Sequence, residues 1–397
     1  MAERPDDAPP ASLTTSLIHH PYQPPRGFEA PQIGVYKAST VIFKDTASMR
    51  ARDWRSKAGY TYGLHGTPTS FTLEERIATL VGGLQCVLTP SGLSAISLVD
   101  MALLNQGDEL LIPGNAYNPG KDFARHDLAR WGIAYRFYDP MDPDGLAAMI
   151  GAQTRLVWIE APGSITMEFP DLRGLLRLCR DKGVTSAVDN TWGAGIAFDA
   201  FALGADIVMQ ALTKYPSGGG DVLMGSATTR DEALHLKLKL AHMRMGLGIG
   251  ANDAETILRA LPSIALRYAA QDATARMLAA WLQRRPEIAQ LLHPAFAGSP
   301  GHDHWAETCS AAAGLFSVVF DKRFSSERVD RFVDALKLFR IGYSWGGSTS
   351  LAVPYDMSHT RRSGPGRDAP LVRFSIGLEG AEDLRADLEQ AFAALAG

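Results

Sequence analysis

The sequence contains little cysteine. Its three cysteines, Cys86, Cys179 and Cys309, are an odd number in a chain of 397 residues, and no two of them have the CxxC spacing. An odd count without that spacing argues against both a disulfide framework and a thiolate zinc site. We interpret the three side chains as buried thiols of a cytosolic protein.

A large charge of one sign is also missing. The chain has 39 Lys and Arg against 43 Asp and Glu, a formal net charge of −4, and no long block of like charge. Proteins that bind nucleic acid in general carry a basic patch or stripe. We therefore expect no nucleic-acid partner.

Long apolar runs are absent as well. No uninterrupted apolar stretch approaches the roughly 18 to 20 residues that a helix needs to cross a bilayer. Residues 1–10 contain acidic residues and prolines instead of the basic and apolar regions of a secretory signal. We expect no membrane partner and a cytoplasmic location.

The chain does have an ordinary globular composition, with 46% hydrophobic and 21% charged residues. A length of 397 residues exceeds one ordinary compact domain, so more than one is expected. Residues 1–61 are rich in proline and turn residues and lack a helical period, which predicts an N-terminal arm. A change of pattern near Pro262 predicts a larger domain over residues 62–262 and a smaller one over residues 263–397.

Short runs of strand character alternate with stretches of helical spacing in the larger domain. The predicted strands cover residues 84–88, 109–112, 134–138, 156–160 and 185–188. The predicted helices cover residues 93–104, 120–130, 146–150 and 172–181. This order predicts an α/β fold with a mostly parallel sheet covered on both faces. A long helix predicted at 265–282, followed by mixed signals, predicts a smaller α+β C-terminal domain.

Three patterns that resemble ligand sites do not meet the requirements of those sites. Gly114 to Lys121 has the wrong glycine spacing for a P-loop, and Asp122 stands where Ser or Thr binds magnesium. Gly246 to Gly250 does not follow a clear strand, as a dinucleotide fingerprint requires. His302 to His304 lie on a Gly/Pro-rich stretch, which is more typical of solvated side chains than of metal ligands. We predict no metal site.

Three other features point to one chemistry. Asp189 follows the apolar run 185–188 at its C-terminal end, where open parallel sheets bind their ligands. Lys214 follows the apolar run 207–212 and precedes a glycine-rich turn, where a lysine can be desolvated and made nucleophilic. Thr89 to Ser94 (TPSGLS) lies between a strand and a helix, so its amides and the helix N-terminus predict an anion site.

A pyridoxal phosphate enzyme needs a lysine for a Schiff base, an acid beside the pyridine nitrogen and a cradle for the phosphate. The chain offers all three. Taken singly, each has an ordinary explanation, since such an acid is usually a helix cap, such a lysine is usually solvated and such a turn is usually only a turn. Their combination favours pyridoxal 5'-phosphate as the cofactor.

Several separated motifs resemble those of the Cys/Met-metabolism family of pyridoxal phosphate-dependent enzymes, the trans-sulfuration enzymes, from about residue 38 to the C-terminus. The motifs are ASTVIF (38–43), YGLHGTPT (62–69), TPSGLS (89–94), NAYNP (115–119), SAVDNTW (186–192) and ALTKY (211–215). PGSITME (162–168) and YSWGG (343–347) are most similar to the β-eliminating members, the bacterial cystathionine β-lyases. Relatives that act at the γ-carbon tend to carry a Pro-Thr-Asn-Pro type motif and to lack the tryptophan.

The resemblance implies an architecture and a set of cofactor contacts. It implies pyridoxal phosphate fold type I (aspartate aminotransferase-like), with residues 62–262 as the cofactor-binding domain, and a homotetramer built as a pair of dimers. Lys214 would hold the cofactor covalently, Asp189 would keep the pyridine nitrogen protonated, and Tyr117 would stack on the ring. The remaining cofactor contacts implied are those of Ser91, Gly92, Leu93, Thr213 and, from a neighbouring subunit, Tyr62.

The resemblance also implies how an amino-acid substrate is bound and changed. Arg373 would pair with the substrate carboxylate, with Ser344 and Trp345 lining the same pocket. Lys214 would remove the Cα proton, and Lys214 or Tyr117 would supply a proton to the leaving group. Tyr62 completes the implied catalytic set.

Two positions depart from the family pattern. Leu64 and His65 stand where relatives commonly have arginines, which removes a phosphate contact supplied across the dimer. Gly218 to Asp221 (GGGD) replaces Gly-His-Ser-Asp, which removes two side chains near the entrance. We expect weaker cofactor binding from the first change and a shifted substrate size from the second.

The expected reaction is α,β-elimination from L-cystathionine or a related cysteine thioether, giving homocysteine or another thiol, pyruvate and ammonia. One alternative is γ-elimination or γ-replacement on cystathionine or homoserine esters. Another is a cysteine-S-conjugate β-lyase or cysteine desulfhydrase. A non-catalytic regulator is not favoured, because the lysine, the acid and the arginine are all present.

Overall fold

The computed structural model describes residue 27, residues 30–357 and residues 365–395. The chain divides into two compact units, Met1–Ile33 and Gly34–Gly397. In the first unit only residues 27 and 30–33 are described, and they form no helix or strand. The predicted arm, residues 1–61, therefore lies partly outside the described residues. Its described part contains one short helix that the sequence did not predict, α2 (Thr46–Arg50).

The second unit contains a seven-stranded sheet in the order β1-β7-β6-β5-β4-β2-β3. Its strands are β1 (Gln85–Thr89), β2 (Glu109–Pro113), β3 (Ala134–Tyr138), β4 (Thr154–Glu160), β5 (Thr185–Asp189), β6 (Ile207–Ala211) and β7 (Gly225–Thr229). The five adjacent strands β3, β2, β4, β5 and β6 run parallel to one another. β7 runs antiparallel to β6 and to β1. The predicted α/β fold with a mostly parallel sheet is confirmed.

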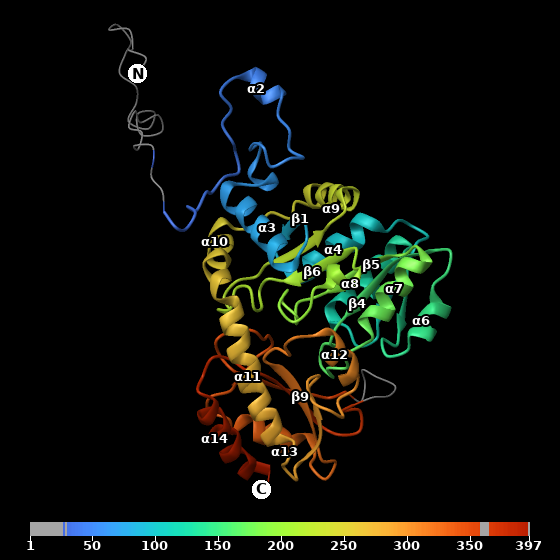
Figure 1. Cartoon of the computed structure of the whole chain (residues 1–397), viewed down its shortest axis with the longest axis vertical. Helices are drawn as coiled ribbons and strands as arrows, with labels where there is room; N and C mark the ends of the chain where they lie inside the picture. The colour runs from blue at the N-terminus through green and yellow to red at the C-terminus, as the bar shows by residue number, and fades with distance from the viewer. Residues whose placement is uncertain (1–26, 28–29, 358–364, 396–397) are drawn as a thin grey trace. The chain divides into compact units, whose positions relative to one another are not determined.

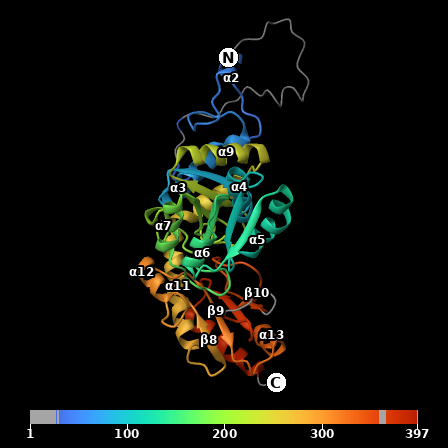
Figure 2. The ribbon, with the colours of Figure 1, turned by 90° about the vertical axis from the view of Figure 1, so that its right-hand side faces the viewer.

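Helices cover both faces of this sheet (Figures 1 and 2). They are α3 (Pro68–Val81), α4 (Gly92–Leu103), α5 (Asn118–Phe123), α6 (Pro143–Met149), α7 (Leu172–Lys182), α8 (Ala200–Leu203) and α9 (Glu232–Met245). Side chains alternate between the faces along a strand. In β4, Leu156 and Trp158 join the apolar cluster that includes α4 and α9, whereas Val157 and Ile159 join the cluster that includes α7. Both faces are thus apolar, as crossover helices require.

A second, five-stranded sheet has the order β10-β11-β12-β9-β8. Its strands are β8 (Ile288–Leu292), β9 (Leu315–Phe320), β10 (Arg340–Ile341), β11 (Leu351–Tyr355) and β12 (Leu371–Ser375). All its pairs are antiparallel except β10 with β11. The helices of this part are α11 (Ile264–Leu282), α12 (His302–Thr308), α13 (Ser326–Asp334) and α14 (Ala381–Ala391), whereas α10 (Ala251–Ala260) packs against α3. Helices α11, α13 and α14 lie beside this sheet (Figure 1). Their apolar side chains share one core with those of the sheet.

Several elements differ from the sequence prediction, and three of them show why. β7 (GSATT) was not predicted because it has few large apolar residues, yet all five of its residues are buried between β1 and β6. The helix predicted over residues 120–130 is α-helical only to Phe123 and continues as a π turn and a 3-10 turn. His302 begins α12 and its ring stacks on Trp305, so the segment predicted as a loop is a helix.

The described part of the chain contains no group of three or more His, Cys, Asp or Glu side chains that could hold a metal ion. None of the helices described is long and apolar enough to cross a membrane.

Candidate active site

Lys214 lies in a tight turn just beyond the C-terminal end of β6. Its amide donates to the carbonyl of Ala211 (3.1 Å), and its Nζ donates to Ser344 Oγ (2.8 Å). The ammonium lies 5.6 Å from the ring centre of Trp345. Burial and, next, the charge of Arg373 lower the pKa of Lys214 to about 8, against the opposing charge of Asp189. The site thus increases the share of neutral amine, the form that acts as nucleophile and base.

Asp189 ends β5, the strand beside β6. Its Oδ1 accepts hydrogen bonds from the amide (2.9 Å) and the hydroxyl (2.5 Å) of Thr191. Burial raises the pKa of Asp189, while the two bonds from Thr191 and the charge of Lys214 lower it. Thr191 is a site residue that the sequence reasoning missed. A hydroxyl residue two positions after a strand-end aspartate was the available signal.

The predicted anion cradle forms at the start of α4. Ser91 caps this helix, and its Oγ accepts from the amide of Ser94 (3.0 Å). The amides of Gly92 and Leu93 lie in the first turn, where a helix offers no internal acceptor. A Cβ on Gly92 would stand 2.7 Å from Cβ of Ala211. Glycine therefore lets a helix N-terminus approach the segment that carries Lys214, which fits a phosphate in both charge and space.

Thr213, also predicted as a phosphate contact, is already paired in this structure. Its Oγ1 donates to the carbonyl of Met224 (3.2 Å) and accepts from the amide of the same residue (3.1 Å). A phosphate contact requires the hydroxyl to give up its bond to that carbonyl.

Tyr117 lies at the N-terminal end of α5, and 42% of its surface is exposed. Its amide donates to Glu160 Oε2 (2.8 Å), and Glu160 is the last residue of β4. Burial first, then the charges of Asp189 and Glu160, raise the pKa of Tyr117. The tyrosine therefore stands close to the carboxyl group predicted to face the pyridine ring. Glu160 is a second residue that the sequence reasoning did not identify.

Arg373 is buried on β12 in the second sheet. Its guanidinium donates to the carbonyl of Ser164 (3.1 Å) and lies 5.2 Å from the ring centre of Tyr355. Ser164 belongs to the segment that follows β4 in the first sheet. Burial lowers the pKa of Arg373, and its charge is near enough to depress the pKa of Lys214. A positive, partly paired guanidinium beside the lysine is suited to a substrate carboxylate.

Ser344 and Trp345 lie on the loop after β10, which packs against Lys214 and Tyr215. Ser344 has a φ of 149°, a backbone conformation that side chains rarely adopt. A Cβ on Gly346 would stand 2.9 Å from the amide nitrogen of Tyr215, and the rings of Trp345 and Tyr215 are 5.6 Å apart. This close packing holds the Ser344 hydroxyl at the lysine.

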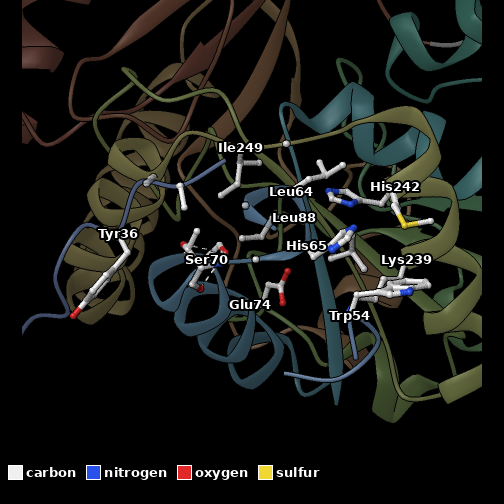
Figure 3. Close-up of a pocket in the computed structure, with 18 of the residues that line it drawn as sticks. Tyr36, Trp54, Leu64, His65, Ser70, Glu74, Leu88, Lys239, His242 and Ile249 are labelled. Carbon is white, nitrogen blue, oxygen red and sulfur yellow. Dashed lines mark hydrogen bonds between the residues drawn. The ribbon is translucent and has the colours of Figure 1, made fainter. Parts of the chain in front are cut away.

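Tyr62, Leu64 and His65 are not brought to Lys214 within the chain. Leu64 and His65 line a separate cavity of about 420 Å³ with residues of α3, β1 and α9 (Figure 3). Lys214, Asp189 and Arg373 do not line this cavity. Tyr62 is 47% exposed and makes an edge-on ring contact with His65 at 6.1 Å.

The gathered residues define a class of protein. A lysine with a depressed pKa, a strand-end aspartate, a helix N-terminus opened by glycine and a buried arginine meet at the C-terminal ends of parallel strands. These groups fit the amine-reactive aldehyde, the pyridine nitrogen and the phosphate of pyridoxal 5'-phosphate. The fold and the site are those of a fold-type-I pyridoxal phosphate-dependent enzyme.

Comparisons with known proteins agree with this class. The chain matches the family of Cys/Met metabolism PLP-dependent enzymes over residues 14–393, and it belongs to that family. It is 37% identical over 386 residues to a cystathionine beta-lyase of Bordetella avium, covering 95% of this chain and 96% of that protein. It is 32% identical to an L-alanine/L-glutamate racemase of Wolbachia pipientis, covering 85% and 83% of the two chains.

A solved structure shows the same fold. The crystal structure of metB from Corynebacterium glutamicum superposes with a TM-score of 0.85 at 28% identity, covering 97% of this chain and 98% of that one. Pyridoxal 5'-phosphate is therefore the cofactor expected of this chain.

Proposed function

We propose that this protein is a carbon–sulfur lyase that catalyses α,β-elimination from L-cystathionine or a related L-cysteine thioether. The products are homocysteine or another thiol, pyruvate and ammonia. The observation that carries the proposal is the Lys214 amine, which is bonded to Ser344 and lies within the electrostatic reach of Asp189 and Arg373. The name of the relative from Bordetella avium supports the reaction class.

The cofactor would be held by groups of this chain at three points. We assign Lys214 to the covalent link, Asp189 to the pyridine nitrogen and Tyr117 to the face of the ring. The amides of Ser91, Gly92 and Leu93 are assigned to the phosphate, with the Thr213 hydroxyl as an additional donor. When bound, pyridoxal 5'-phosphate supplies an electron-withdrawing ring that stabilises negative charge at the substrate Cα.

Lys214 is the general base in this proposal. The depressed pKa of about 8 leaves a useful fraction of the amine neutral near neutral pH. Ser344 Oγ, which accepts from Nζ at 2.8 Å, holds one N–H of the amine in place and can take part in proton movement. Tyr117 or Lys214 then delivers a proton to the departing sulfur.

Arg373 would bind and orient the substrate. Its planar guanidinium can pair with the α-carboxylate through two bonds, and burial strengthens such a pair. Ser344 and Trp345 line the same space, and Gly219 and Gly220 leave its edge open because both are exposed and carry no side chain. A Cβ on Gly347 would stand 3.7 Å from the amide nitrogen of Gly220, so the glycine turn borders the substrate loop.

The products of one substrate test the reaction. With cystathionine, β-elimination yields pyruvate, whereas γ-elimination yields 2-oxobutyrate. We expect pyruvate and homocysteine in equal amounts. A panel of S-substituted cysteines, cysteine and homoserine esters then separates a cystathionine lyase from a cysteine-S-conjugate lyase, a desulfhydrase and a γ-replacing enzyme. Formation of 2-oxobutyrate alone would contradict the proposal.

A racemase is the second candidate, because a racemase is among the relatives that match most of the chain. Racemisation needs the same Cα proton removal followed by return of a proton to the opposite face. Incubation with L-alanine and L-glutamate, followed by chiral analysis, distinguishes it. We expect no racemisation comparable in rate with pyruvate formation from cystathionine.

The assembly is proposed as a homotetramer in which Tyr62 enters the site of a neighbouring subunit. Large apolar side chains near it are exposed in the single chain, among them Tyr36 (52%) and Ile42 (87%). Contact with a second copy would cover them. Light scattering on a sizing column measures the mass, and a monomer that is fully active would contradict the arrangement.

The proposal also includes a division into domains and a cellular location. We divide the chain into an arm (1–61), a cofactor-binding domain (62–262) and a C-terminal domain (263–397), because the two sheets fall on either side of Pro262. We place the protein in the cytoplasm, since its three cysteines are free.

A further inference from the structure

Two carboxyl groups end neighbouring strands at the cofactor site. Glu160 closes β4 and Asp189 closes β5, and these two residues are direct partners in the parallel register. Parallel partners project from the same face of a sheet. Both line a small cavity of about 20 Å³, together with Tyr117 and Lys121. The proposed function uses Asp189 alone, so Glu160 is a partly buried acid without an assigned role.

The two carboxyl groups receive different numbers of hydrogen bonds. Asp189 accepts two from Thr191, one from its amide and one from its hydroxyl. Glu160 accepts one, from the amide of Tyr117. Donated hydrogen bonds stabilise the ionised form of a carboxyl group. The geometry therefore favours the negative charge on Asp189.

The charges around the pair favour the same assignment. Lys214 faces Asp189, while Lys121, whose Nζ donates to the carbonyl of Gly114 (2.9 Å), acts on Glu160. Burial and the charge of Asp189 raise the pKa of Glu160 well above its usual value, and the Tyr117 amide and Lys121 oppose this. Two partly buried carboxylates side by side repel each other, so one keeps its proton.

The other titratable groups near Glu160 do not change this balance. Asp100 on α4 lines the same cavity, accepts from Trp158 Nε1 (2.7 Å), and burial raises its pKa to about 7. Tyr138 donates its hydroxyl to the carbonyl of Trp158 (2.7 Å), and burial raises its pKa well above the usual value. Neither group supplies a positive charge to Glu160.

We propose that Glu160 is a positioning residue that stays protonated beside ionised Asp189 and fixes Tyr117 through its main-chain amide. The inference rests on the proposed function for the place of Tyr117 on the cofactor ring. A neutral Glu160 leaves one negative charge at the ring nitrogen, so the charge there is not doubled. The bond to the Tyr117 amide sets the start of α5, and hence the distance of the tyrosine ring from the carboxyl pair.

Two substitutions separate charge from position. Glu160→Gln keeps a neutral side chain of the same shape with an oxygen that accepts from the Tyr117 amide. Glu160→Leu keeps the approximate size but removes the acceptor. Glu307→Leu, an exposed site on α12, is the matched control. Each variant is freed of cofactor and titrated with pyridoxal 5'-phosphate, following the visible absorbance and the circular dichroism of the bound cofactor.

We expect the Gln variant to bind the cofactor within about twofold of wild type with the same dichroic band. We expect the Leu variant to bind about tenfold more weakly, the loss typical of one hydrogen bond, with an altered band. An infrared difference spectrum between wild type and the Gln variant at pH 7 should contain a protonated-carboxyl band. These readouts do not depend on turnover, so they remain informative if the lyase assay fails.

Two results would overturn the inference. If Glu160→Gln weakens binding as much as Glu160→Leu, or if the infrared difference shows only an ionised carboxylate, Glu160 acts through a negative charge. If Glu160→Leu binds the cofactor with wild-type affinity and an unchanged dichroic band, the contact with Tyr117 positions nothing. Thermal unfolding of each variant identifies a general loss of folding, in which case Glu160→Gln and the infrared band decide the matter.

Discussion

Lys214 is held where its charged form is disfavoured. Its ammonium donates to Ser344 Oγ, and the nearby Arg373 adds a like charge. The neutral form of the amine is useful for chemistry, but below its pKa the folded chain has to keep the charged form in the same place. The depressed pKa should therefore make the free energy of unfolding depend on pH, which can be measured without substrate.

Stability of the cofactor-free protein should rise with pH through the window set by Lys214. Its pKa falls from 10.5 to about 8 on folding, so between these values the unfolded chain binds a proton that the folded chain does not. The free energy of unfolding therefore increases with pH there, by on the order of 3 kcal/mol in total. Urea unfolding from pH 7 to pH 10 measures it. Lys214→Met should remove this part of the slope and Lys237→Met should keep it, and equal slopes in both would refute the assignment.

Asp189→Asn should leave the fold intact and reduce elimination on the order of 100-fold, because a neutral amide cannot hold a proton on the pyridine nitrogen. Initial rates of pyruvate formation measure the effect, with far-ultraviolet circular dichroism as the check on folding. Asp199→Asn, which changes the cap of α8, is the matched control. Near-normal turnover in the Asp189 variant would rule out its proposed role.

Arg373→Ala should harm substrate use more than cofactor content. A charge-assisted pair with a carboxylate is worth about 1.5 to 3 kcal/mol, which corresponds to roughly 10-fold to 150-fold in kcat/KM. Arg373→Lys keeps the charge but not the planar guanidinium, so its kcat/KM should lie between those of wild type and Arg373→Ala. Steady-state kinetics and the visible absorbance of bound cofactor are compared. A cofactor-free variant with unchanged amino-acid affinity would assign the arginine to the phosphate instead.

At the scale of the elements, the start of α4 packs closely against the end of β6, and Gly92 makes this approach possible. Gly92 begins α4, and any Cβ there would meet Ala211 at 2.7 Å, well inside van der Waals contact. The approach brings the amides of the first helical turn to the strand that leads into Lys214. A helix of 12 residues supplies the partial positive charge that such an anion site uses.

Gly92→Ala should therefore weaken cofactor binding although the amide itself remains. Relief of the clash requires α4 or β6 to move, at a cost of about 1 to 3 kcal/mol in folding free energy. Thermal unfolding and cofactor release during dialysis measure the two effects. Gly151→Ala is the control, since a Cβ there has nothing within 4 Å. Equal behaviour of the two variants would mean that the helix start is not fixed by this contact.

At the scale of the whole molecule, the segment around Leu64 bears on the proposed assembly of subunits and on how that assembly holds the cofactor. Leu64 lines the cavity shown in Figure 3 near His65, His242 and Lys239, not the space beside Lys214. The resemblance implies that an arginine at this place would reach the phosphate of a second subunit, a contact that Leu64 does not make. Without an arginine at this place, cofactor retention should be weaker and less dependent on salt than in relatives.

Leu64→Arg should tighten pyridoxal phosphate binding if a neighbouring subunit brings its phosphate to this segment. The added charge also meets the repulsion of Lys239 in its own chain, so the gain is expected to be modest, about 1 kcal/mol or fivefold in retention. Cofactor release during dialysis compares the variant with wild type, and Leu84→Arg, on an exposed position, serves as control. Faster or unchanged release would show that Leu64 does not face the phosphate.

The local sequence determined most of the parallel sheet and the positions of several candidate site residues. The strands β2 to β6 follow from apolar runs, and the places of Asp189, Lys214 and Gly92 follow from their positions at strand and helix ends. These features depend on neighbours along the chain, which a sequence displays. β7 was not predicted because its side chains are small. They are buried by the strands on both sides and not because they are strongly hydrophobic.

Only the tertiary structure decided which distant residues meet. Arg373 reaches Ser164 across 209 positions, and Lys214 reaches Ser344 across 130. The proposed role of Glu160 became visible only when neighbouring strands placed its carboxyl group beside that of Asp189. Burial and charge act through space, so the pKa of Lys214 depends on side chains that its own segment does not contain.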